Sequence, residues 1–164
     1  MEQLVKGGGS VSSIAEFNVF TQKGVKAGVP AFDAASATYT LPCFTIRTGS
    51  DYCLESANAG YASGNEVRAY SCDGTDEQEW EFTGEGLIRH IDSGLTLDSY
   101  SDVSIWSEDG TSGQYWNLDD GYLSNSGAYL ELGSQSDLSD VYMASYRGAD
   151  DYYYADQQFF LAHC

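Results

Sequence analysis

Positively charged residues are scarce in this sequence of 164 residues. Seven Lys and Arg stand against 25 Asp and Glu, which gives a net charge of −18. A surface of this charge repels the phosphates of nucleic acids and the anionic face of a membrane. Basic patches and Arg-rich loops are also missing. We therefore exclude nucleic acid and direct membrane insertion, and otherwise the charge favours solubility.

Long apolar runs are also missing, and none approaches the roughly 18 residues that a membrane helix needs. The first ten residues contain no apolar core of a signal peptide. Two alternatives stay open. A signal peptide has been removed and Met1 is foreign to the natural chain, or export uses another route.

Motifs of catalysis are absent. The sequence contains no Gly-x-Ser-x-Gly, no His-Glu-x-x-His, no phosphate loop and no EF-hand spacing. Its two His, His90 and His163, make a Ser-His-Asp triad improbable. With 25 carboxylates, a glycosidase-like acid pair can be imagined anywhere and carries no information. We expect a binding protein without enzymatic activity or cofactor.

The packing residues indicate a folded, all-β chain. Aromatic residues make up 14% of the sequence and hydrophobic residues 42%, which is too many for a disordered chain. The apolar residues form short alternating runs broken by Gly, Asp and Asn, as in strands joined by tight turns. The length fits one domain plus an extension.

Three sequence elements recur three times in the same order. The first contains a Leu followed by an acid, the second is a short strand predicted to begin with Val, and the third is Gln-x-aromatic. The sets are Cys53-Leu54-Glu55, Thr96-Leu97-Asp98 and Tyr129-Leu130-Glu131; then Val67–Tyr70, Val103–Trp106 and Val141–Ala144; then Gln78-Glu79-Trp80, Gln114-Tyr115-Trp116 and Gln157-Gln158-Phe159. One Gln-x-Trp would be noise, but an ordered set of three elements is a strong signal.

Each repeat holds about four short strands and cannot bury its apolar face alone. Three repeats around a pseudo-threefold axis would bury their large side chains together, each contributing roughly 1.5–3 kcal/mol. The residues predicted to form this shared core are Leu54, Leu97, Leu130, Trp80, Trp116 and Phe159.

This threefold Gln-x-Trp pattern resembles the ricin-B-type (R-type) lectin family, also called family 13 carbohydrate-binding modules. The resemblance covers about residues 41–164 and implies a β-trefoil with subdomains at about 41–82, 83–119 and 120–164. It also implies a secreted protein that binds glycans or glycoproteins, galactose-type sugars among them.

The four Cys allow three disulfide pairings. The resemblance implies that Cys53 and Cys72 close a loop within the first subdomain. A closed trefoil places its first and last strands side by side, so Cys43 and Cys164 would join its ends. An even count used in this way argues for an oxidising compartment. A metal site is the alternative, but there is no Cys-x-x-Cys, and we expect no bound metal.

The second subdomain matches the family's sugar pocket best. The resemblance implies that Asp98 is the carboxylate, Trp106 the aromatic platform, Ser104 a polar neighbour and Gln114 the residue that orients Asp98. Gly113 replaces the usual Asn, which removes one contact to a sugar hydroxyl. The alternative is that Trp106 has only a structural role.

The other two subdomains depart further from the family pattern. In the first, Glu55 replaces the Asp, Tyr70 is the candidate platform, and Gln78 orients the acid; Arg68 and Glu55 could instead form a structural ion pair. In the third, Glu131 aligns with Asp98, but Ala144 occupies the platform position. Tyr142 or the run Tyr152-Tyr153-Tyr154 could substitute. At least one Tyr of that run should be exposed, either as a binding surface or in a loop that packs on itself.

Residues 1–40 lie outside the repeats and are predicted to form an extended arm, with a strand over 14–20. Some multi-subunit toxins carry such extensions on ricin-like subunits and dock them onto a partner. The sequence therefore leaves three function classes open: a lectin, a receptor-binding or assembly subunit whose arm contacts a protein partner, and a trefoil protease inhibitor, for whose active loops the sequence contains no signature.

Overall fold

The computed structural model describes residues 10–11, 40–83 and 85–164. The predicted strand over 14–20 and most of the predicted arm lie outside these residues. The described strands are β1 (Ser10–Val11), β2 (Thr40–Arg47), β3 (Tyr52–Ser56), β4 (Asn65–Ser71), β5 (Trp80–Thr83), β6 (Ile88–His90), β7 (Thr96–Asp98), β8 (Ser104–Trp106), β9 (Asn117–Asp119), β10 (Tyr122–Asn125), β11 (Ala128–Leu132), β12 (Ser139–Ala144) and β13 (Phe160–His163).

Short 3-10 helices connect some of these strands, and the described ranges contain no α-helix. They are η2 (Ala57–Ala59), η3 (Asp76–Gln78), η4 (Ser112–Gln114) and η5 (Tyr154–Gln157). Three of them, η3, η4 and η5, end at the Gln of the repeated triplet. The repeated sequence thus produces the same local structure three times.

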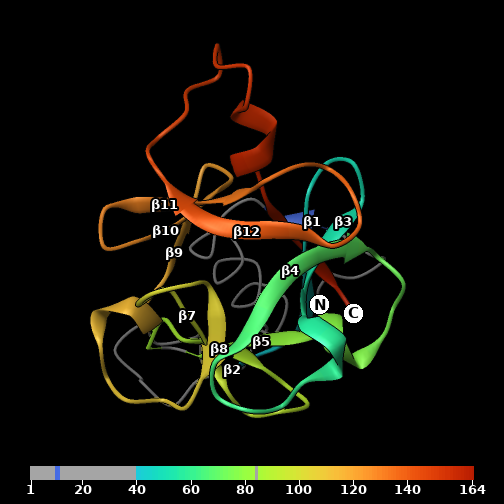
Figure 1. The fold of residues 1–164 in the computed structure, drawn as a ribbon, viewed down its shortest axis with the longest axis vertical. Helices are drawn as coiled ribbons and strands as arrows, with labels where there is room; N and C mark the ends of the chain where they lie inside the picture. The colour runs from blue at the N-terminus through green and yellow to red at the C-terminus, as the bar shows by residue number, and fades with distance from the viewer. Residues whose placement is uncertain (1–9, 12–39, 84) are drawn as a thin grey trace, which may run out of the picture.

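The strands form three consecutive sets of four: β2–β5, β6–β9 and β10–β13. Strands β4, β8 and β12 come from different sets and lie near the middle of the view in Figure 1. Strand β4 pairs with both β8 and β12. This all-β arrangement is the predicted β-trefoil.

The starts of the central strands differ from the prediction that each begins with Val. Strands β4 and β12 begin two residues earlier, and β8 begins one residue later, at Ser104. The earlier starts follow from pairing between subdomains, because Asn65 pairs with Ile105 and Ser139 pairs with Ala69.

The predicted core is confirmed. The six repeated Leu and aromatic residues lie in one hydrophobic cluster, and none is more than 3% exposed. The indole N–H groups of Trp80 and Trp116 donate to the carbonyl oxygens of Leu54 and Leu97, at 3.1 and 3.0 Å. Each of these Trp side chains therefore joins the third repeated element to the first.

Two disulfides complete the fold, and both have the pairing that the resemblance implied. Cys43 and Cys164 join β2 to the C-terminal end of the chain, where β13 pairs antiparallel with β2, and their Cα atoms are 5.5 Å apart. Cys53 of β3 is bonded to Cys72, just after β4, with Cα atoms 5.1 Å apart. The first bridge closes the circle of three subdomains, and the second lies within one subdomain.

The buried His90 predicts a loss of stability in mild acid. Its ring packs edge-on against Trp80 at 5.2 Å, and burial lowers its pKa below the usual value, although the nearby Glu77 carbonyl and Asp92 charge oppose this. Below the pKa of the unfolded chain, about 6.5, the unfolded state binds a proton that the folded state resists. The free energy of unfolding therefore falls with pH until His90 also titrates in the folded protein.

We expect urea unfolding to show a smaller loss of stability between neutral and mildly acidic pH for His90→Gln than for the original chain. The comparison of the two pH profiles cancels the titration of the carboxylates that both proteins share. Parallel profiles would contradict the assignment to His90.

Candidate functional site

Each of the three repeated Gln residues positions one acidic side chain. Gln78, Gln114 and Gln157 are fully buried. Their Nε2 atoms donate to carboxylate oxygens of Glu55, Asp98 and Glu131, at 3.2, 2.9 and 3.0 Å. Their Oε1 atoms accept from the backbone N–H groups of Asp73, Asp109 and Arg147, at 3.0, 2.9 and 2.9 Å. The orienting role that the resemblance implied for Gln78 and Gln114 is thus visible, and Gln157 repeats it.

Two of the three carboxylates are neutralised by an Arg. In the first subdomain, Arg68 Nε donates to Glu55 Oε2 at 2.8 Å, which is the structural ion pair considered from the sequence. In the third, Arg147 Nε donates to Glu131 Oε1 at 2.7 Å, and Tyr142 adds its hydroxyl at 3.0 Å. Glu131 thereby accepts four hydrogen bonds from described residues, whereas Glu55 accepts two, one of them from the Arg68 cation.

Removal of the Arg147 side chain should destabilise the third subdomain. Glu131 is 2% exposed, and a buried carboxylate that loses its cation is costly. Since Tyr142 and Gln157 remain as donors, we expect Arg147→Ala to lower the free energy of unfolding by about 2 kcal/mol.

The matched control is Arg89→Ala, because Arg89 pairs with Glu81 through side chains that are both 27% exposed. Exposed pairs contribute at most about 1 kcal/mol. Urea unfolding measures both variants. Equal losses would show that Glu131 does not depend on its Arg.

Asp98 differs from both other carboxylates. It is 4% exposed, and its described contacts are two: Gln114 on Oδ2 and the backbone N–H of Tyr100 on Oδ1, at 2.7 Å. Among the residues that the structure describes, no ion pair to Asp98 is found. A carboxylate offers about four acceptor positions, so Asp98 keeps acceptor capacity for a ligand.

Asp98 opens into a cavity of about 660 Å³ in the second subdomain. The lining residues are Gly64, Asp98, Tyr100, Ser101, Asp102, Ser104, Trp106, Asp109 and Thr111. Trp106 is 43% exposed there, whereas the other two Trp are buried. The structure therefore brings Asp98, Ser104 and Trp106 to one cavity, with Gln114 behind the carboxylate.

One wall of the cavity comes from the first subdomain. The backbone N–H of Gly64 donates to the carbonyl of Ile105 at 2.8 Å. A Cβ atom at Gly64 would lie 3.1 Å from the Trp106 ring, and the residue has a positive φ of 92°. A glycine is thus needed for this close approach. The contact holds one side of the Trp106 ring.

Gly113 has a steric reason to replace the usual Asn. A Cβ atom at this position would lie 3.1 Å from both Asp98 Oδ1 and the backbone nitrogen of Tyr100. The Gly113 carbonyl also accepts the N–H of Ser99 at 3.0 Å. The segment after β7 thus approaches the triplet closely, and Tyr100, which is 84% exposed, lines the cavity instead.

Tyr100 was missed from the sequence. Nothing in the repeated elements marks it, because it follows the Leu-Asp pair in a connecting segment. Two features of the sequence could have pointed to Tyr100: it is an aromatic residue two positions after Asp98, and Gly113 replaces the Asn that the family has at that position.

The predicted site residues of the first and third subdomains lie close together, but their side chains contact an Arg–Glu ion pair. Tyr70 is half-buried, and the guanidinium of Arg68 lies 5.8 Å from its ring centre. Tyr70 and Gln78 therefore contact the two members of the Glu55–Arg68 ion pair, Tyr70 through Arg68 and Gln78 through Glu55. In the third subdomain, Ala144 offers no ring, and the hydroxyl of Tyr142 is bound to Glu131.

The Tyr run lies in a longer loop of the third subdomain. The Gln side chain bonds to a Ser carbonyl 7 residues before it in the first two subdomains, and 12 residues before it in the third. The longer segment projects from one end of the molecule (Figure 1). Tyr152 is 89% exposed and Tyr153 47%, as expected for at least one of the three, while Tyr154 packs against Tyr122.

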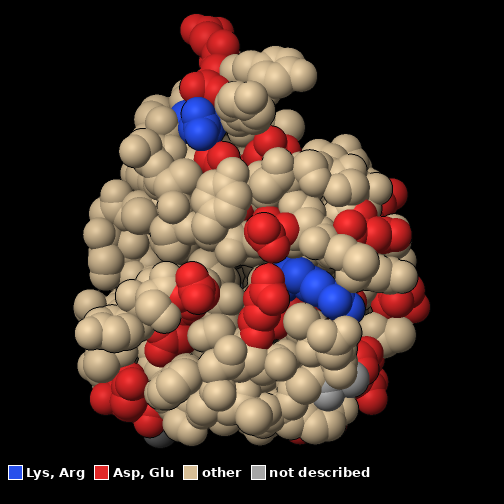
Figure 2. All heavy atoms as spheres, in the orientation of Figure 1, with Lys and Arg blue, Asp and Glu red and all other residues tan. Residues whose placement is uncertain are grey.

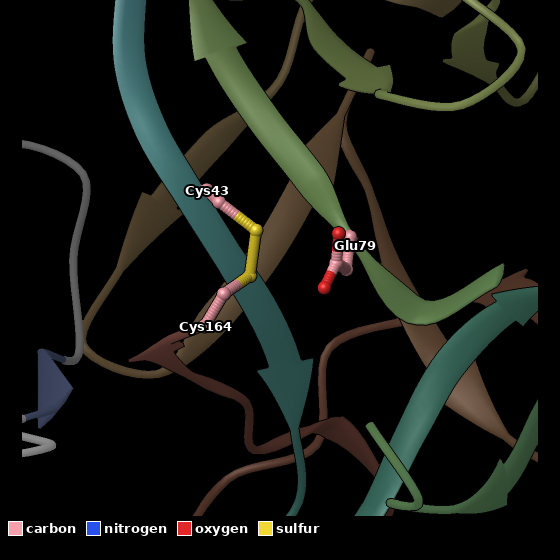
Figure 3. A group of neighbouring side chains, drawn as sticks. All are labelled: Cys43, Glu79 and Cys164. Carbon is pink, nitrogen blue, oxygen red and sulfur yellow. A yellow bond between two sulfur atoms is a disulfide. The ribbon is translucent and has the colours of Figure 1, made fainter. Parts of the chain in front are cut away.

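One group of potential metal ligands lies near the chain end, formed by Cys43, Glu79 and Cys164. Figure 3 shows the Glu79 side chain beside the disulfide. Both sulfur atoms are bonded to each other, so neither offers the thiolate that binds a metal. The group therefore provides a single carboxylate.

The described part of the chain contains no helix long and apolar enough to cross a membrane.

Comparisons with known proteins agree with this architecture. Curated protein sequences give no significant match. Among solved structures, the designed threefold-symmetric protein ThreeFoil is 27% identical, with a TM-score of 0.62, over 74% of this chain and 99% of ThreeFoil. The C-terminal half of an earthworm R-type lectin, solved with GalNAc, is 13% identical with a TM-score of 0.65, over 74% of this chain and 98% of the lectin.

A third similar structure comes from bitter gourd, Momordica charantia. It is a non-toxic homologue of type II RIPs in complex with α-methyl-D-galactoside. It is 19% identical with a TM-score of 0.67, over 77% of this chain and 49% of that protein. The family profile of the ricin-type β-trefoil lectin domain matches residues 43–153. The chain therefore belongs to the ricin-type β-trefoil lectin family, a family of carbohydrate-binding domains.

Proposed function

We propose that this protein binds galactose-type glycans through the cavity of its second subdomain. The observation that carries the proposal is the state of the three oriented carboxylates. Glu55 and Glu131 are paired with Arg, while Asp98 forms no ion pair with any residue that the structure describes and opens beside the exposed ring of Trp106. One subdomain of three then provides the binding site.

The cavity offers what a sugar ring requires. Trp106 provides an aromatic face for the apolar side of the ring, and Asp98 and Ser104 provide oxygen atoms for its hydroxyls. The preference for galactose is supported by two of the similar structures, which were solved with GalNAc and with a galactoside. A single site of this kind binds at roughly millimolar affinity. Useful avidity would need several copies of the protein on one surface.

Titration with galactose and lactose tests the proposal. Of the three Trp, Trp80 and Trp116 are at most 3% exposed, so a fluorescence change on sugar addition reports Trp106. We expect saturable binding, and a loss of about tenfold or more in affinity for Asp98→Asn, since hydrogen bonds to a charged group contribute about 1.5–3 kcal/mol.

Glu55→Gln is the matched control at the equivalent position of the first subdomain. It keeps one of the two oxygens that accept from Arg68 and Gln78, and its sugar affinity should equal that of the original chain. Equal affinities of all three proteins, or no binding of galactose and lactose, would reject the site.

The two disulfides support secretion, because such bonds persist in oxidising compartments.

The second candidate function is a receptor-binding or assembly subunit, and the two Arg-neutralised carboxylates favour it. In that case the glycan sites have degenerated and the N-terminal arm contacts a protein partner. Size-exclusion chromatography with the natural secreted proteins would reject this alternative if only the free monomer elutes.

A further inference from the structure

A second cavity adjoins the one that contains Asp98. Its volume is about 530 Å³, and its lining residues are Gly64, Glu66, Asp102, Val103, Ser104, Asp140, Val141 and Tyr142. Gly64, Asp102 and Ser104 line both cavities, so the two share a wall. In Figure 2, acidic side chains lie on several sides of a hollow near the middle of this face, and one basic side chain lies beside it.

The threefold repeat explains the acidic lining. Glu66, Asp102 and Asp140 each directly precede the Val of the repeated central strand element. Strands β4 and β12 and the segment just before β8 bring these three positions together. Glu66 pairs with Ser104, Asp140 pairs with Arg68, and all three acids line the second cavity. The second cavity therefore receives residues from all three subdomains.

Negative charge dominates both cavities. Five carboxylates line them, those of Glu66, Asp98, Asp102, Asp109 and Asp140, and the described residues that line them include no Lys, Arg or His. Arg68, the cross-strand partner of Asp140, directs its guanidinium to Glu55 at 2.8 Å. Charges within a Debye length, about 10 Å at moderate salt, act together on a bound ligand. The site therefore favours a cationic ligand over an anionic one.

The second cavity also contains an aromatic side chain. Tyr142 is 42% exposed, and the bond from its hydroxyl to Glu131 fixes its position. Trp106 is an exposed aromatic side chain of the first cavity. An exposed aromatic ring beside carboxylates is suited to a sugar ring with polar substituents. Both cavities thus combine the two features that the proposed function requires of the first.

We propose that the two cavities form one elongated site that selects oligosaccharides containing free amino sugars and rejects acidic glycans. This inference rests on the proposed function, because it assigns the first sugar ring to Trp106 and Asp98. A second ring would lie against Tyr142, with its ammonium group near Glu66 and Asp140. N-acetylated and other neutral sugars bind without this electrostatic gain.

Isothermal titration at mildly acidic pH and low salt tests the selection by charge. The probes are D-galactosamine against N-acetyl-D-galactosamine, and lactose against 6′-sialyllactose. We expect the free amine to bind at least about fivefold more tightly than its acetylated form, and the sialylated sugar to bind about fivefold more weakly than lactose. Both ratios should shrink in high salt. A free-amine galactosamine dimer should gain further affinity over the monomer.

The double variant Glu66→Gln/Asp140→Asn tests the second cavity. It should reduce the affinity for the galactosamine dimer by about fivefold and change the affinity for galactose, a single neutral ring held in the first cavity, much less. Asp150→Asn is the matched control, since Asp150 is exposed and lines neither cavity. It should change neither affinity.

The outcomes separate this inference from the proposed function. If lactose binds but the amine has no advantage, or if the double variant behaves like the control, the elongated site is wrong and the proposed function stands. If trilysine displaces galactosamine as effectively as the dimer does, the site is a general cation surface and the inference is wrong. If no neutral sugar binds, the proposed function itself fails.

Discussion

Trp106→Ala should abolish detectable binding of galactose and lactose while the protein stays folded. Aromatic residues at the centre of a site commonly contribute about 2 kcal/mol or more, which is roughly a 30-fold change in affinity. Starting from millimolar binding, this loss moves the affinity beyond measurement. The fold should tolerate the change, because Trp106 is 43% exposed and lies outside the hydrophobic core. Isothermal titration measures the binding, and circular dichroism verifies the fold.

Tyr70→Ala is the control for this variant. Tyr70 occupies the position of the first subdomain that corresponds to Trp106, and it lies near Arg68, which is paired with the oriented carboxylate there. Its removal should leave the affinity for sugar unchanged. A reversed result, with binding lost in Tyr70→Ala and kept in Trp106→Ala, would place the site in the first subdomain.

Removal of the Cys43–Cys164 disulfide should cause the largest loss of stability. The bridge spans 121 residues, whereas the Cys53–Cys72 bridge spans 19. In the chain-entropy model, the longer loop contributes about 4–5 kcal/mol and the shorter about 3 kcal/mol. Domains of this size have a total stability of about 5–15 kcal/mol. A double Cys→Ser variant without the first bridge should therefore be marginally stable.

Urea unfolding of the two double variants, Cys43→Ser/Cys164→Ser and Cys53→Ser/Cys72→Ser, measures both losses. The first variant should have the lower midpoint, because its bridge joins the ends of the closed β-trefoil while the second joins strands already adjacent in one subdomain. A greater loss on removal of the shorter bridge would show that loop length does not control stability in this fold.

The fold was predictable because the same ordered set of three sequence elements occurs three times. In each repeat the Gln forms hydrogen bonds with an acidic side chain and with the backbone, and the Leu and the aromatic residue pack into one shared core. Three sequence patterns, each weak alone, therefore indicate the same fold. The core of Leu54, Leu97 and Leu130 follows from that agreement, whereas the Cys53–Cys72 pairing was implied by the family resemblance and the Cys43–Cys164 pairing by the closure of a trefoil. The outer parts of the chain carry no repeat, and the predictions for residues 12–39 stay predictions.

The state of each pocket was less accessible from the sequence. The Glu55–Arg68 ion pair could be anticipated, because the two residues belong to repeated elements that form neighbouring strands, where they lie opposite each other. Arg147 could not, because it reaches Glu131 from a loop whose length differs from that of its counterparts. The role of Tyr100 and the shared wall between two cavities likewise depend on connecting segments, which follow no repeated pattern.

The most direct measurement is a crystal structure of this protein soaked with lactose, together with the stoichiometry of binding in solution. We expect one sugar per chain, with a ring stacked on Trp106 and its hydroxyls on Asp98. Sugar bound at Glu55 or Glu131, or three sugars per chain, would show that Arg neutralisation does not decide which of the three oriented carboxylates binds glycans.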